Sequence, residues 1–521
     1  MIINTYSEKQ LLLQIKNYDN LIIYGAGMVG ELVFSRLKAY GLCKKIVGFA
    51  VSKKNRATDQ DLTYCGLPIY EIIELENYKK NAVILIATLP NLHKEIKELL
   101  LEHKFEHLVL MTQKAYMDLS NHYMHNYNQC HPVIFPKNVT TKIVFMASDN
   151  NIVSGAFLCM TELCIQLQKR GIGVLVILPY YGLGSSLLSQ KQIPYTYIRS
   201  YDWGYEIAKD HDLLEKIRFL FRLWSNRKAK KEIEYLLQTN RVDLVHCNTT
   251  FTYIGAVAAR DCGIPFVWHL RENMENLGFR IFLYPLALKL LQRANKVIAV
   301  SNYIKGLIPF EKEGQICTVY DAVEKDDCSN REILNEKIVR MIMVGVLAEH
   351  KEQKEMLRAC AILKAKEKID FHLLLVGKGE NEYIGELKEL IQEGDLEENV
   401  SFYGASSNVY ELYEQADLSF VCGRKEAYGR VTIESLLSGC LVIGVDAGGT
   451  AELIRDGENG YLYKAGDPES LADKVVMAIK NPDLSRTMAR LGQEHAHRTY
   501  TKERNLQQIV DVYEEVLKRK L

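Results

Sequence analysis

The stretch from Val421 to Tyr463 constrains the fold more than any other part of the chain. Its letters, VCGRKEAYGRVTIESLLSGCLVIGVDAGGTAELIRDGENGYLY, predict a loop, a helix, a strand, a glycine-rich turn, a second helix and a further glycine-rich turn. Strands that alternate with helices indicate a parallel sheet covered by helices. Ligands of such open sheets bind beyond the carboxyl ends of the strands. The loop before the helix VTIESLLSG is therefore a candidate site.

Two carboxylates accompany this loop. Glu426 lies in the loop, and Glu434 lies in the first turns of the helix. Gly429 allows the backbone between them to approach a ligand closely, and the free N–H groups of the helix start form an anion site. Arg424 and Arg430 flank the same turn. These groups predict a site for a phosphorylated, hydroxyl-rich ligand, although acidic residues near a helix start can also serve only as complements of the helix dipole.

The longer motif E-A-Y-G-R-V-T-I-E, followed by G-G-T-A-E-L-I-R-D-G-E-N-G-Y-L, resembles the signature of glycosyltransferase family 4. This is the "group 1" family of retaining enzymes that use nucleotide sugars. The resemblance begins near Lys142 and implies the GT-B fold, which has two facing Rossmann-like domains. It implies an acceptor domain over 141–320 and a donor domain over 321–521, whose last helix, Lys502–Leu521, crosses back onto the acceptor domain.

The resemblance also implies how the donor diphosphate is held. Lys351 stands where the family uses a lysine to neutralise the donor pyrophosphate. The arginine of the family string G-R-L-x-x-x-K-G is Val346 here, and the glycine after the lysine is Glu352. Part of the usual phosphate clamp is thus absent, and Arg424 or Arg430 is expected to substitute for it.

Further roles follow from the same resemblance. Glu434 is expected to bind the ribose hydroxyls, and Glu426 the transferred sugar. His269, in the string HLRE after an apolar strand, is expected at the edge of the crevice near that sugar, although a lone histidine there is more often structural. Gly155 is expected to approach the donor phosphate or the acceptor. The backbone amides from Gly429 to Val431 complete the predicted donor site.

The leaving group of such a reaction is a nucleoside diphosphate, whose charge must be neutralised. The sequence has no D-x-D motif between apolar strands, and cationic side chains with a helix N-terminus can stabilise the charge instead. We therefore expect no metal and no other cofactor. Two alternatives remain at this stage: an epimerase or hydrolase of nucleotide sugars on the same fold, and a non-catalytic nucleotide-sugar sensor.

An additional Rossmann-like domain is predicted over residues 1–118. The string LIIYGAGMVGELVFSRL predicts a strand, a turn and a helix, and its glycines follow the G-x-G-x-x-G fingerprint at Gly25, Gly27 and Gly30. The acidic residue that would hold a ribose is missing, since the next strand, IVGFAV, ends in Val51. With the later GLPIY, the segment resembles the nucleotide-sugar-binding domains of some sugar O-acyltransferases. A nucleotide sugar is a better candidate ligand than NAD, and a purely structural domain is the alternative.

Two other segments lie outside these motifs. Residues 119–140 lose periodicity, which predicts a linker. The segment Lys216–Lys231 contains seven basic residues, no acidic one, and interleaved aromatic rings. Such a helix is typical of contact with an anionic membrane surface, although a solvated helix face is an equal alternative.

Length, net charge and cysteine content limit the number of domains and the kinds of partner and metal site to be expected. A chain of 521 residues is expected to form about three domains, and its zero net charge gives no reason to expect a nucleic-acid partner. The twelve cysteines form no C-x-x-C pair and no zinc pattern, which favours reduced thiols in the cytoplasm. The first residues lack the pattern of a signal peptide, and no uncharged apolar run reaches the ~18–20 residues of a membrane span. The expected place is the cytoplasm, at the inner face of the plasma membrane if the basic segment binds there.

Overall fold

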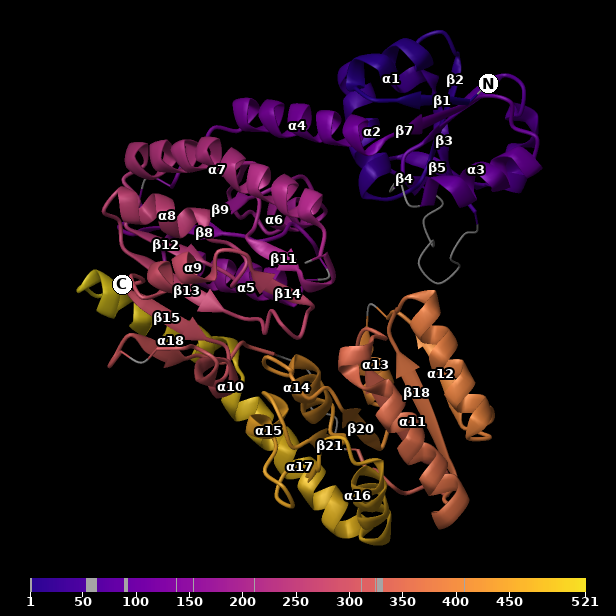
Figure 1. Cartoon of the computed structure of the whole chain (residues 1–521), viewed down its shortest axis with the longest axis vertical. Coiled ribbons are helices and arrows are strands. Elements are labelled where there is room, and N and C mark those ends of the chain that lie inside the picture. Colours follow the sequence, from indigo (N-terminus) through magenta and orange to yellow (C-terminus); the bar gives the residue numbers. More distant parts are fainter. Residues whose placement is uncertain are drawn as a thin grey trace. The chain divides into compact units, whose positions relative to one another are not determined.

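The structure is a computed structural model of the chain. It describes residues 2–52, 63–88, 92–136, 138–152, 154–209, 211–310, 312–323, 325, 331–406 and 408–521. The described chain forms three main sheets with helices between the strands (Figure 1). The predicted α/β class is therefore confirmed. Two compact units emerge, one of Met1–Ile134, Asp149–Ile152 and Ile177–Arg199, and the other of the remaining chain.

The N-terminal sheet has the strand order β1-β7-β6-β2-β3-β5-β4. Neighbouring strands in this sheet are parallel, except that β4 pairs with β5 in the antiparallel sense. The strands are β1 (Ile2–Thr5), β2 (Asn20–Tyr24), β3 (Ile46–Val51), β4 (Thr63–Tyr64), β5 (Leu67–Glu71), β6 (Ala82–Ile86) and β7 (Leu108–Met111), with helices α1 (Glu8–Ile15), α2 (Met28–Ala39) and α3 (His93–Glu102). The predicted strand, glycine turn and helix at the start of this domain are present as β2 and α2.

The segment predicted as a linker, 119–140, is helical over its first half, because helix α4 (Gln113–Cys130) runs through it. The Thr112 side chain caps this helix by accepting from the N–H of Ala115. Leu119 and Met124 are buried, and the polar residues between them hide the helical period in the sequence.

The end of α4 lies beside strand β10 (Tyr195–Tyr197). The Asn128 amide donates to the Tyr197 carbonyl (2.7 Å) and accepts from the Tyr197 N–H (3.0 Å), as a neighbouring strand would. The Tyr127 ring stacks on Tyr195 with 4.8 Å between centroids. Helix α4 thus covers an edge strand whose backbone would otherwise be unpaired.

The middle sheet has the order β10-β9-β8-β12-β13-β15-β16. Strand β8 has β9 on one side and β12 on the other, which is a topological switch point where ligands of open sheets bind. Its other strands are β8 (Lys142–Met146), β9 (Gly173–Leu178), β12 (Leu244–Cys247), β13 (Phe266–Leu270), β15 (Lys296–Ala299) and β16 (Ile316–Thr318). Its helices are α5 (Gly155–Lys169), α6 (Gly184–Gln190), α7 (Leu213–Thr239), α8 (Ile254–Asp261), α9 (Tyr284–Leu291) and α10 (Asn302–Gly306), and β11 (Gly204–Glu206) pairs with β14 (Phe279–Ile281) in a separate antiparallel ribbon.

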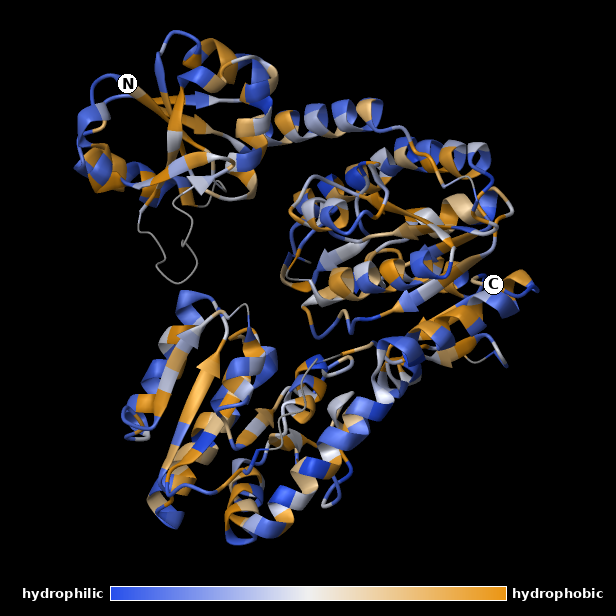
Figure 2. Ribbon diagram, turned by 180° about the vertical axis from the view of Figure 1, so that it is seen from behind, coloured by the Kyte–Doolittle hydropathy of each residue, from blue (hydrophilic) through white to orange (hydrophobic). Residues whose placement is uncertain are grey.

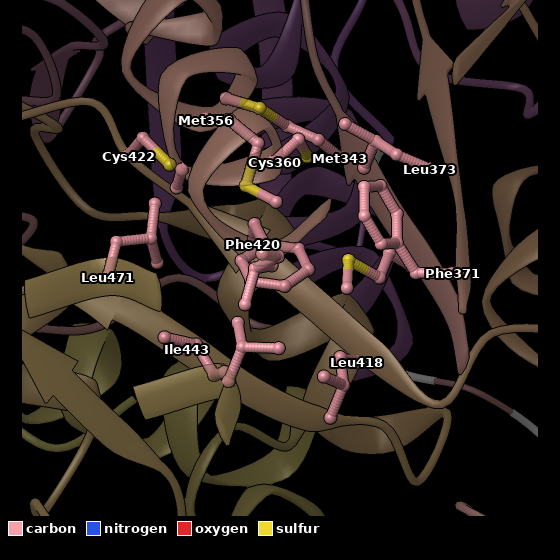
Figure 3. Packing of buried hydrophobic residues seen from close by; sticks show 14 of the residues in the cluster. Met343, Met356, Cys360, Phe371, Leu373, Leu418, Phe420, Cys422, Ile443 and Leu471 are labelled. Carbon is pink, nitrogen blue, oxygen red and sulfur yellow. The ribbon is translucent and has the colours of Figure 1, made fainter. Parts of the chain in front are cut away.

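The C-terminal sheet has the order β19-β18-β17-β20-β21-β22. Its strands are β17 (Val339–Val344), β18 (Phe371–Val376), β19 (Val400–Gly404), β20 (Leu418–Val421), β21 (Leu441–Val445) and β22 (Tyr461–Tyr463). Its helices are α11 (Gln353–Ile362), α12 (Asn381–Glu393), α13 (Val409–Tyr413), α14 (Arg430–Leu437), α15 (Thr450–Leu453), α16 (Pro468–Lys480) and α17 (Pro482–Thr499). Figure 3 shows Phe420 at the centre of its core, with Met356 and Cys360 of α11 nearby.

The surrounding helices carry hydrophobic and polar residues in alternating bands (Figure 2). This pattern lets one face of each helix pack on a sheet while the other meets water. The last helix, α18 (Lys502–Leu517), returns to the middle sheet. There the Tyr513 hydroxyl lies 2.7 Å from Nδ1 of His246 on β12, and the Asn505 amide donates to the Tyr320 carbonyl at 2.7 Å.

Candidate functional site

An ion pair between Lys351 and Glu426 lies at the centre of the candidate site. Lys351 belongs to the segment after β17, and Glu426 to the loop between β20 and α14. These two strands are parallel neighbours, so the loops at their carboxyl ends meet. The side chains are 23% and 13% exposed, which leaves both reachable from solvent. The structure thus brings together two predicted site residues that are 75 positions apart.

The loop that carries Glu426 rests on two glycines that follow β21. The N–H of Gly449 donates to the Glu426 carbonyl at 2.7 Å. A β-carbon at Gly448 would lie 2.9 Å from the Arg424 carbonyl oxygen, and one at Gly449 would lie 2.9 Å from that of Ala427. Any side chain here would push the loop away. Both glycines belong to the G-G-T string of the family motif, which is the sequence signal for this contact.

Helix α14 begins at the glycine that the sequence suggested. Gly429 is the N-cap and has a φ of +87°, a left-handed conformation that disfavours side chains. The first N–H groups of the helix, around Val431, have no acceptor within the helix and attract an anion. The loop with Glu426 and the start of α14 therefore offer a carboxylate beside an anion site.

The side chains of Arg430 and Glu434 form an ion pair along α14, with 2.8 Å between Nε and Oε1. Burial raises the pKa of the Glu434 carboxyl, and the charge of Arg430 opposes that rise. The Arg430 guanidinium also lies 3.4 Å from the Cys159 sulfur, one turn into α5. At the start of α5, a β-carbon on Gly155 would meet no atom within 4 Å, so this helix start is open.

Arg424 is engaged elsewhere. Its guanidinium contacts Glu355 at 2.8 Å and Glu352 at 3.2 Å. Glu352 stands where the family has a glycine, and its φ is +59°. This left-handed conformation costs a residue with a β-carbon about 1–2 kcal/mol relative to glycine. Arg424 and Arg430 were expected to replace the family arginine that is missing at position 346. Both are bound to carboxylates here, and their contact with a donor phosphate stays a prediction.

The predicted position of His269 is wrong. It lies within β13 and is completely buried, not at an open crevice edge. Its Nδ1 is 3.2 Å from an Arg271 nitrogen. Burial, then the charge of Arg271, lower the pKa of its imidazole, which is neutral at pH 7. Its Nε2 has no hydrogen-bond partner among the described residues. The expected contact of His269 with the transferred sugar stays a prediction.

Contacts that sequence reasoning missed join the middle sheet to the Glu426 loop. Buried Arg271 forms an ion pair with Asp321, whose carbonyl accepts from the Tyr428 hydroxyl at 2.6 Å. The Ser301 hydroxyl donates to the Ala427 carbonyl. Glu452 accepts from the Asn302 N–H at 2.8 Å, at the start of α10. The contacts of Tyr428 and Ala427 tie the Glu426 loop to residues that follow β16 and β15.

The N-terminal glycine turn has the geometry that its fingerprint predicts. A β-carbon on Gly25 would lie 2.7 Å from the Ala87 carbonyl oxygen, and one on Gly30 would lie 1.9 Å from that of Gly25. A β-carbon on Gly27, the N-cap of α2, would meet nothing within 4 Å. This helix start is therefore open, and its binding of a nucleotide sugar stays a prediction.

In the part of the chain that the structure describes, no group of three or more His, Cys, Asp or Glu side chains is arranged to hold a metal ion. Metal independence is accordingly a matter for experiment.

Two family models match adjoining parts of the chain. "Glycosyltransferase Family 4" matches residues 153–320, and "Glycosyl transferases group 1" matches residues 324–495. The putative glycosyltransferase EpsD of Bacillus subtilis (strain 168) is 32% identical over 312 residues, which are 55% of this chain and 80% of EpsD. The N-acetyl-alpha-D-glucosaminyl L-malate synthase of Bacillus anthracis is 28% identical over 240 residues, covering 44% of this chain and 61%, less than two thirds, of that relative.

Solved structures agree on the fold. The crystal structure of Anabaena Alr3699/HepE in complex with UDP superimposes with a TM-score of 0.58 and 23% identity, covering 72% of this chain and 99% of that chain. At this identity the likeness shows the fold alone. The predicted GT-B fold is confirmed.

Proposed function

This chain is a glycosyltransferase of family 4, group 1, and on that premise we propose that it moves a sugar, with retention and without a metal, from a nucleotide sugar to a hydroxyl of a glycan or lipid-linked acceptor in surface polysaccharide synthesis. The observation that carries the proposal is the Lys351–Glu426 ion pair beside the start of α14. It supplies a cation and a carboxylate at the place where a diphosphate and a sugar would meet.

In the proposed reaction, the bond between the anomeric carbon and the diphosphate oxygen breaks, and a bond from that carbon to the acceptor oxygen forms. The acceptor proton leaves with the nucleoside diphosphate. Lys351 and the N–H groups after Gly429 stabilise the growing diphosphate charge. Glu426 faces the transferred sugar, which becomes positively charged in the transition state. Glu434, held by Arg430, is assigned to the ribose hydroxyls.

A donor screen tests this function. The full-length protein is incubated with UDP-, GDP- and ADP-sugars, with and without a mixed glycan and glycolipid acceptor extract. We expect one nucleotide class to be consumed, with its sugar on an acceptor and activity nearly unchanged in EDTA. An isomerised or merely hydrolysed donor sugar under every acceptor condition would indicate the epimerase or hydrolase, and strict metal dependence would contradict a purely cationic clamp.

Helix α7 supports peripheral contact with an anionic membrane at the inner face of the plasma membrane. Its N-terminal half exposes Leu213, Leu214, Phe221 and Trp224, each at least 61% exposed. The Arg227 guanidinium lies over the Trp224 ring at 5.5 Å. Exposed apolar and basic side chains on one helix suit an interface between lipid headgroups and acyl chains. No helix of the described ranges is long and apolar enough to cross a bilayer.

Sedimentation with phosphatidylglycerol vesicles tests the membrane contact. We expect binding at low salt that weakens at high salt, because each basic residue near the surface contributes about 1 kcal/mol. The double variant Phe221→Ser/Trp224→Ser should lose most binding. Tyr235→Ser is the matched control, since Tyr235 is 72% exposed further along the same helix. Equal loss in the control, or no sedimentation of the parent protein, would favour a solvated helix face.

A further inference from the structure

A cavity of 730 Å³ opens beside the Glu426 loop. The segment after β13, strand β14, the start of α9 and the end of α10 form its walls, and Lys425, the neighbour of Glu426, reaches it from the C-terminal part of the chain. The cavity therefore connects the acceptor side of the fold with the candidate catalytic loop.

Its walls are mainly apolar. Side chains from three separate segments contribute: Met274, Phe279, Phe282, Tyr284, Leu307 and Ile308. The apolar surface continues to the outside, because Tyr284 is 49% and Leu307 is 51% exposed at the rim. Sugar hydroxyls pressed against such a wall would lose hydrogen bonds to water without replacement, which is unfavourable.

Polar and charged side chains also line the cavity: Thr250, Glu272, Asn273, Glu275, Arg280, Tyr303 and Lys425. Glu272 accepts from the Thr250 N–H at 3.0 Å, and burial raises the pKa of its carboxyl to about 7 despite that bond. The Asn273 amide donates to the Tyr303 hydroxyl at 3.0 Å. Lys425 is exposed to solvent and lines the same cavity. A ligand here would therefore place hydroxyls at Glu272 and Lys425 and an apolar group against the aromatic wall.

We infer that this cavity holds the apolar aglycone of the acceptor, which makes the acceptor an amphiphile with its reacting hydroxyl on or next to a hydrophobic chain or ring. A free oligosaccharide is not its substrate. This inference rests on the proposed function and narrows its acceptor class. It also agrees with the exposed apolar side chains of α7, since an amphiphilic acceptor resides in a membrane.

Calorimetric titration of the full-length protein with methyl and octyl glucoside, below the micelle concentration, tests the inference. Each buried methylene improves affinity about fourfold, the equivalent of about 0.8 kcal/mol. We therefore expect octyl glucoside to bind at least tenfold more tightly than methyl glucoside. The variants Phe279→Ala and Leu307→Asp should remove most of that preference. Leu307 is half exposed, so its replacement tests the cavity even if Phe279→Ala fails to fold.

Phe221→Ser/Trp224→Ser is the control, because those residues belong to α7 and not to the cavity. Equal affinity for the two glucosides, or loss of the preference in the α7 control alone, would overturn the inference. Donor turnover is measured in the same variants. If nucleotide release persists while the glucosides bind equally, only the acceptor inference fails. If no nucleotide sugar is consumed by any protein, the proposed function itself fails.

Discussion

Replacing Glu426 by glutamine is expected to lower kcat by about 10²–10³-fold, the usual cost of losing one preorganised electrostatic group at a reacting centre. Glutamine keeps the shape of the side chain but removes the negative charge that faces the transferred sugar. The backbone contact from Gly449 to the Glu426 carbonyl is unaffected by the change. The loop should therefore keep its position, and the loss should appear in the chemical step.

The measurement is the rate of nucleoside diphosphate release at saturating donor, with Tm as the check on folding. Glu469→Gln is the matched control, because Glu469 is 69% exposed and its ion-pair partner is the exposed Lys366. Turnover of Glu426→Gln within a few-fold of the parent protein, at an unchanged Tm, would remove Glu426 from the catalytic assignment.

Replacing Lys351 by alanine is expected to weaken binding of the nucleoside diphosphate about ten- to a hundredfold. A hydrogen bond to a charged group contributes about 1.5–3 kcal/mol. The variant also leaves the Glu426 carboxylate without its partner, so a like charge would face the phosphates. The double variant Lys351→Ala/Glu426→Gln should recover part of the binding, since it removes that repulsion.

Calorimetry with the nucleoside diphosphate selected by the donor screen measures both variants. Lys366→Ala is the control, because it removes an exposed lysine of the other ion pair. Unchanged affinity in Lys351→Ala would place the phosphates elsewhere. The start of α14 and Arg430 would then be the groups to replace next.

The sequence alone was sufficient for the local units. Apolar runs such as KIVFM and LVIGV, each followed by glycine or polar residues, predict strands that the structure contains as β8 and β21. The Gly429 turn was predictable because a left-handed residue before a helix is a property of a few neighbouring residues. The family motif added which of these turns belong to the site.

Helix α4 could not be predicted from local sequence patterns. Its sequence is rich in Asn, His and Tyr, which resembles a loop. In the structure those same residues bond to β10: the Asn128 amide pairs with the Tyr197 backbone, and Tyr127 stacks on Tyr195. Their stabilising partners are about 70 residues away in the chain, so no local window contains the reason for the helix.

The composition of the site was decided by tertiary structure. Lys351 meets Glu426 because the parallel sheet places β17 beside β20, an order that the sequence does not state. Glu352, at a family glycine position, pairs with Arg424 from a loop about 70 residues further along the chain. The sequence placed His269 near the end of a strand, but its burial depends on β12 and β15, which lie on the two sides of β13. The family motif and the local turns depend on residues that are neighbours in the chain. Ion pairs and burial depend on residues that are neighbours only in the folded structure.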